Sequence, residues 1–200
     1  MATATWWTHE ARHCGRQAFV LPVLAALLAA TAAFAHSGAG TLLARTLLVC
    51  ALPVATALAC ASVTAREPMP ELHLSLPTPY PRTVLRRLCW PASIAVLGAT
   101  ALSLLPGAAR FGGPVLLLPE LAGLTTLLCG LAVWATARAG SATPAAGLVL
   151  SAVLVKVLLL DQLAPRGLAT ALPEFLAGAL LLALSRSHLS RLRHPAGGAA

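Results

Sequence analysis

The chain has 200 residues, of which 58% are apolar and only 10% are charged, and its mean hydropathy is +0.82. This composition is typical of a protein solvated by a lipid bilayer and excludes an ordinary water-soluble domain. The formal net charge of +8 comes from arginines at the ends of apolar stretches, where their side chains reach anionic lipid headgroups. The positive charge therefore does not indicate nucleic-acid binding.

Six apolar stretches follow one another, each close to the ~20 residues that a helix needs to cross the hydrocarbon layer. We predict an all-α, polytopic membrane protein with six transmembrane helices and short loops. The predicted spans are about 17–35, 43–64, 88–108, 115–137, 144–163 and 170–185. They form a transmembrane domain over 17–185, preceded by a short segment, 1–16, and followed by a basic tail, 186–200.

The arginines are distributed unevenly between the two sides of these spans. If the N-terminus is cytoplasmic, ten arginines fall inside: Arg12, Arg16, Arg66, Arg82, Arg86, Arg87, Arg138, Arg186, Arg191 and Arg193. Three fall outside: Arg45, Arg110 and Arg166. Because positively charged loops stay in the cytoplasm, we predict a cell-membrane protein with both termini cytoplasmic.

The first sixteen residues have the composition of an interfacial amphipathic segment, with Trp6 and Trp7 suited to the headgroup region. Within this segment, His9-Glu10-Ala11-Arg12-His13 matches H-E-x-x-H, which places two imidazoles on one helical face for zinc. Arg12 would repel the metal, and no third ligand is evident in the sequence. An intramembrane metallopeptidase is therefore a remote alternative, and we expect no metal and no other cofactor.

The first span has a second interpretation, as a cleavable secretory signal. Arg12 and Arg16 precede the apolar run, and Ala33-Phe34-Ala35 fits a small-x-small cleavage site. The run is longer than the usual 7–15 residues of a signal. We expect it to be retained, and cleavage stays open.

The longest connection, 65–87, is predicted to be cytoplasmic and to contain a short helix. Pro70 suits a first helical turn, Glu71 complements its dipole and Pro77 ends it. Met69, Leu72 and Leu76 share one face, and a helix of two turns is stable only when a membrane or a partner buries that face. After it, Thr78-Pro79-Tyr80-Pro81 is predicted to form an extended elbow before the third span. The connection is thus a candidate docking site for a cytoplasmic protein.

This layout resembles the membrane subunit of a type 2 ATP-binding-cassette exporter of the small actinobacterial type. The likeness lies in an E-x-R segment before the first span and in the order of two spans, a short cytoplasmic helix and four more spans. At residue level it is carried by two stretches, residues 10–16 and 67–87. The resemblance implies a coupling helix that docks on a separate ATP-binding subunit, with Glu67, Met69, Glu71, Leu72, Leu76 and Arg82 as docking residues.

The chain itself has no P-loop, because its only lysine, Lys156, lies between Val155 and Val157 in a span. We therefore expect no ATPase or other enzymatic activity in this chain, and we expect a second membrane subunit to complete a pathway. A different interpretation is a small membrane anchor or regulator that binds a cytoplasmic partner through the same connection. The five cysteines show no C-x-x-C or metal-ligand spacing, and we expect no disulfides.

Apart from the arginines, four charged residues fall within the predicted spans: Lys156, Asp161, Glu120 and Glu174. Asp161 follows Lys156 by five positions, which in an α-helix places it about 140° away and makes a same-helix pair poor. Leu118-Pro119-Glu120-Leu121 and Leu172-Pro173-Glu174-Phe175 are similar to each other, and each is read either as a first-turn cap or as part of a functional cluster. We predict that Lys156 pairs with Glu120 or Glu174, with a lysine that reaches the outer headgroups as the alternative.

Overall fold

The computed structural model describes residues 17–34, 41–65, 80–161 and 168–191, and every regular element in these ranges is helical. The long helices are α2 (Gln17–Phe34), α3 (Thr41–Ala65), α4 (Tyr80–Ser103), α5 (Gly113–Ala139), α6 (Ala142–Val155) and α8 (Leu168–Arg191). A 3₁₀-helix, η3 (Pro106–Phe111), joins α4 to α5, and a π-helix, η4 (Lys156–Leu160), continues α6. The predicted all-α fold is confirmed for the described residues.

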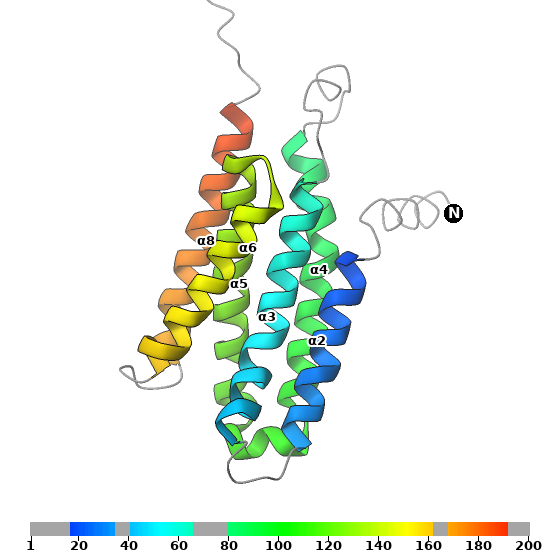
Figure 1. Ribbon diagram of the computed structural model, residues 1–200, viewed down its shortest axis with the longest axis vertical. Helices are drawn as coiled ribbons and strands as arrows, with labels where there is room; N and C mark the ends of the chain where they lie inside the picture. The colour runs from blue at the N-terminus through cyan, green and yellow to red at the C-terminus, as the bar shows by residue number, and fades with distance from the viewer. Residues whose placement is uncertain (1–16, 35–40, 66–79, 162–167, 192–200) are drawn as a thin grey trace, which may run out of the picture.

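Successive helices run in alternate directions along the long axis of the molecule, so that α5 and α8 are parallel (Figure 1). Helices α3 and α5 occupy the middle of the bundle, with α2 and α4 on one side and α6 and α8 on the other. The core lies between α3 and α5, where the largest fully buried side chains include Leu48, Leu52, Leu121, Leu124 and Leu128. The leucines of α5 recur at helical spacing, which buries one stripe of that helix against α3.

Four described helices are long and apolar enough to cross a membrane: Leu43–Ala65, Gly113–Ala139, Ala142–Leu159 and Leu168–Ser187. Ala18–Phe34 is apolar but shorter. The chain therefore has the helices of a multi-pass membrane protein, and four of the six predicted spans meet these criteria.

Helix α4 is not among these four membrane-spanning candidates, because its first two turns carry arginines and its apolar part is confined to Leu88–Ser103. The helix begins at Tyr80, so the predicted extended elbow is wrong for Tyr80 and Pro81, and a proline in a first turn is favoured there. The span predicted to reach residue 108 ends at Ser103, before Pro106 opens η3. Helix α8 continues to Arg191, so the first part of the predicted tail is helical.

The outward faces of the bundle are apolar, with large exposed side chains on α2, α6 and α8 such as Leu24, Leu154 and Leu180. One end of the bundle, where α4 begins and α5 and α8 end, is here named the basic end. It carries the described arginines Arg86, Arg87, Arg138 and Arg186, whereas Arg45 and Arg110 lie towards the opposite end.

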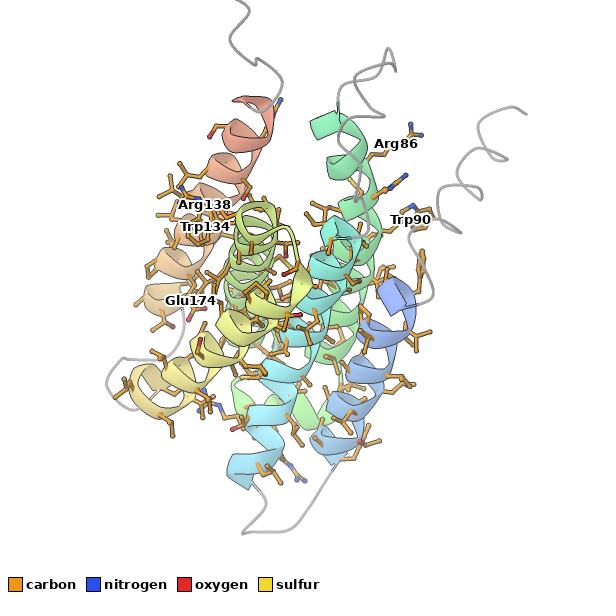
Figure 2. The ribbon with its side chains drawn as sticks, turned by 45° about the horizontal axis from the view of Figure 1, so that its top comes forward. Arg86, Trp90, Trp134, Arg138 and Glu174 are labelled. Carbon is orange, nitrogen blue, oxygen red and sulfur yellow. The ribbon has the colours of Figure 1, made fainter. Side chains whose placement is uncertain are left out.

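Two tryptophans accompany the arginines at the basic end (Figure 2). Trp134 lies under the guanidinium of Arg138, 5.0 Å from ring centroid to charge, and Trp90 packs edge-on against Phe19 with centroids 5.7 Å apart. Amphipathic rings beside arginines are typical of a membrane–water interface. The basic end thus has the side chains of an interfacial layer.

Candidate functional site: a buried charge cluster

Lys156 and Asp161 are positioned by the π-helix η4, which widens the last turns of α6. The backbone N–H of Asp161 donates to the carbonyl of Lys156, five residues earlier, as a π-helix requires. This hydrogen bond brings Asp161 over Lys156, and Lys156 Nζ lies 3.9 Å from Asp161 Oδ1. The expectation that these two residues form a poor pair was wrong, because it assumed α-helical rotation between them.

Lys156 pairs with Glu174 of α8, on the same side of the bundle (Figure 1). Its Nζ lies 2.5 Å from Glu174 Oε1 and donates a hydrogen bond to it. Both residues are buried, with 3% of Lys156 and 8% of Glu174 exposed, and Figure 2 shows Glu174 on the inner side of α8. The alternative of a lysine that reaches the outer headgroups does not fit this geometry, because the ammonium group is enclosed and occupied by a carboxylate.

The two similar Pro-Glu segments lie inside helices rather than in their first turns. Helix α5 begins at Gly113 with Pro114 in its first turn, and α8 begins at Leu168. Pro119 and Pro173 are therefore interior prolines, each of which lacks the N–H that would bond the carbonyl four residues earlier. The cap interpretation is wrong for both glutamates, whose side chains are buried instead.

Glu120 has a different partner from the one predicted. Its Oε1 lies 3.6 Å from a guanidinium nitrogen of Arg45, a residue of α3 whose side chain is 16% exposed. Arg45 was placed in an outside connection by the sequence, but it belongs to the second turn of α3. The arginine reaches α5 because α3 and α5 pack against each other along the core.

These residues form one group, here named the charge cluster: Arg45, Glu120, Lys156, Asp161 and Glu174. Three ion pairs link its members, namely Arg45–Glu120, Lys156–Asp161 and Lys156–Glu174, and Glu120 lies within electrostatic range of the other four. All five side chains come from the helix ends opposite the basic end, since α3, α5 and α8 begin there and α6 finishes there. Charged groups within membrane spans usually face the bundle interior and pair with one another.

The parallel pair α5 and α8 fixes the heights of the two glutamates. A Cβ on Gly123 would lie 2.6 Å from the carbonyl oxygen of Ala171, and one on Gly130 would lie 2.5 Å from that of Gly178. Gly178 also lies against Thr126, so Glu174 is placed between the levels of Ala122 and Thr126, about 3–9 Å further along the axis than Glu120. The cluster is therefore spread along the bundle rather than gathered in one plane.

The structure does not test the predicted docking residues or the H-E-x-x-H motif. Glu67, Met69, Glu71, Leu72 and Leu76, together with His9-Glu10-Ala11-Arg12-His13, lie outside the described residues. Arg82 lies in the first turn of α4. Among the described residues, no group of three or more His, Cys, Asp or Glu could hold a metal ion.

Two residues near the cluster were missed by the sequence reasoning. Arg45 could have been found from its position inside an apolar stretch, where an arginine needs a carboxylate partner. Cys50, which is buried on α3, lies within electrostatic range of Lys156, Asp161 and both glutamates. Nothing in the sequence distinguishes this thiol from the other cysteines.

Comparison with known proteins adds no relative to this picture. No family model matches the chain, and no curated protein and no solved structure matches it.

Proposed function

We propose that this chain is a six-span subunit of a membrane transport protein of the cell membrane. The observation that supports the proposal best is the charge cluster, in which Lys156 and Glu174 are 3% and 8% exposed. Burying ionisable groups in a bilayer is costly, so such groups are retained where they handle a polar or charged solute. Three irregular backbone sites adjoin the cluster, namely Pro119, Pro173 and η4, and such interruptions accompany functional sites in membrane helices.

In this proposal α2 and α4 also cross the membrane, and the basic end faces the cytoplasm with both termini. The described arginines at that end and the interfacial tryptophans support this orientation. Single cysteines introduced at Gly112 should react with an impermeant thiol reagent from outside, whereas those at Gly140 should not. The native cysteines are first replaced by alanine or serine, and reversed labelling of the two positions would overturn the orientation.

The energy source in this proposal is a separate ATP-binding subunit that docks on the connection 65–87, which makes the complex an ATP-driven exporter. The support is the sequence resemblance, together with the position of this connection, which joins α3 to α4 at the basic end. A second membrane subunit, identical or different, would complete the pathway. The exposed apolar side chains of α2, α6 and α8 provide surface for it or for lipid.

Replacing both Leu72 and Leu76 by Asp tests the docking step. The change should abolish co-purification of the ATP-binding subunit from native membranes, because a short helix derives its stability from burying its apolar face. Membrane insertion should be unchanged, and Ser75→Asp serves as the matched control. Unaltered co-purification in the double variant contradicts the docking site, and a co-purifying soluble partner without ATPase activity would favour the membrane-anchor interpretation.

A further inference from the structure

Among the described residues, the charge cluster carries one negative charge in excess. It contains two positive side chains, Arg45 and Lys156, and three negative ones, Glu120, Asp161 and Glu174. Within the same described ranges, Arg45 pairs with Glu120, whereas Lys156 lies against two carboxylates. The excess therefore belongs to Lys156, Asp161 and Glu174, here named the lysine triad.

One carboxylate oxygen of the triad has no donor in the described part of the chain. Glu174 Oε1 accepts the hydrogen bond of Lys156, but Oε2 is buried and has no hydrogen-bond partner among the described residues. An ionised oxygen without a donor is unfavourable in a low-dielectric interior, whereas a protonated carboxyl group carries no net charge and becomes a donor itself. The geometry therefore favours the binding of one proton by the triad, which neutralises the excess negative charge.

We propose that the lysine triad binds one exchangeable proton, shared by the carboxyl groups of Glu174 and Asp161. The step converts one carboxylate and a hydronium ion into a carboxylic acid and water, and it needs no oxidant or reductant. The proton reaches the triad from solvent through Asp161, because the side chain of Asp161 is 30% exposed while that of Glu174 is 9% exposed. With the proton bound, the ammonium of Lys156 is balanced by a single carboxylate.

The groups that face the triad come from each element packed around it. In the described ranges they are Cys50 of α3, Glu120 of α5, which Arg45 of α3 accompanies, and the triad members of η4 and α8. Because Arg45 and Glu120 balance each other, they do not remove the excess charge. The inference deepens the proposed transport role, and it rests on that role only for what the proton is used for. A bound proton gives the cluster two charge states, one for each of two successive stages of solute movement.

Infrared difference spectroscopy of the purified chain in lipid nanodiscs tests the proposal directly. The sample is titrated from about pH 9 to about pH 5, so that the pH stays above the usual carboxyl pKa of about 4 throughout. The wild type should gain the C=O band of one carboxylic acid, and the band should shift in D₂O. Asp161→Asn should lose this band, because the remaining pair of Lys156 and Glu174 is already balanced. Lys156→Met should show about twice the wild-type band, because both carboxylates then need a proton.

Glu67→Gln, which changes a carboxylate of the predicted cytoplasmic connection, is the matched control and should keep the wild-type band. Asp161→Asn is preferred to changes at Glu174 because Asp161 is partly exposed and the substitution keeps its size. Absence of the band in the wild type, its persistence in Asp161→Asn, or an unchanged band in Lys156→Met each overturns the proposal. The experiment uses neither ATP nor a partner protein, so its failure is distinct from failure of the docking test.

Discussion

The pairs α5–α8 and α2–α4 show two different ways in which helices associate in this protein. In the first, small residues allow backbone contact, and a Cβ on Gly178 would collide with the backbone of Thr126 and Leu127. In the second, side chains meet only in part and leave an open apolar groove of about 480 Å³. Val23 and Leu27 of α2 and Ile94 and Leu97 of α4 line this groove.

The difference follows from the solvent. Lipid tails are as apolar as leucine, so burying leucine gives two helices little reason to associate, and close packing of small residues provides the attraction instead. The pair α5–α8 therefore holds the shape of the bundle, and it also carries both glutamates of the charge cluster. The pair α2–α4 offers a surface that lipid tails can fill.

The largest effect should come from Gly178→Leu in the α5–α8 contact. The new side chain has no space between the two backbones, so α8 must separate from α5 and the folded bundle should be lost. Thermal unfolding in detergent, followed by size-exclusion chromatography, measures the folded fraction.

Gly147→Leu is the matched control, because a Cβ at Gly147 meets no atom within 4 Å. It changes the same residue type in an apolar helix and should leave the folded fraction close to that of the wild type. Equal behaviour of the two variants would mean that backbone contact does not hold α5 and α8 together.

Lys156→Met should have the next largest effect. It leaves Glu174 buried without its counter-charge, and breaking such a pair commonly costs about 3–5 kcal/mol. Adding Glu174→Gln should restore part of the loss, since no unbalanced carboxylate then remains at that position. A double-mutant cycle of unfolding free energies gives the coupling between the two positions.

The same cycle on Arg45 and Glu120 should give a smaller coupling, of about 1 kcal/mol, because that pair is longer and its arginine is partly exposed. A coupling near zero for Lys156 and Glu174 would refute a paired buried lysine. Lowering the pH should reduce the loss in Lys156→Met, because protonation removes the charge that the lysine no longer balances.

The smallest effect is expected from Gly98→Ala at the α2–α4 groove. Its Cβ would lie 3.1 Å from Leu52 Cδ2, the end of a flexible side chain, with Ala26 next nearest. A small rotation of Leu52 accommodates it, and the gain in helix propensity offsets the contact, so the stability should change by less than about 1 kcal/mol. A loss as large as that of Gly178→Leu would show that Leu52 of α3 cannot move aside and that α4 is closely packed at Gly98.

The sequence located the helices well because apolar runs of membrane length are long, strong signals. Their ends were less predictable, since they depend on local events such as Pro106 closing α4 or the helix of α8 continuing past Arg186. Mean hydropathy over a window of residues does not detect such local events.

The charge cluster was predicted in part for a similar reason. The cost of an unpaired lysine in a span indicated a carboxylate partner on another helix, and Glu174 was one of the two named. Asp161 was named in the cluster but not as a partner of Lys156, because ideal α-helical rotation separates the two residues, and no residue pattern in Lys156–Leu160 reveals a π-helix. Arg45 was counted with the outside connections although it lies within the predicted span 43–64, so no carboxylate partner was predicted for it.

The π-helix also stores one residue more than an α-helix of the same height would contain. If η4 tightened to α-helical geometry, every later residue would rotate by about 100° around the axis of α6. Asp161 would then leave Lys156, while Lys156 could keep its contact with Glu174, because α8 need not move. A change of helical register within five residues is thus sufficient to divide the cluster, with no rearrangement of the bundle around it.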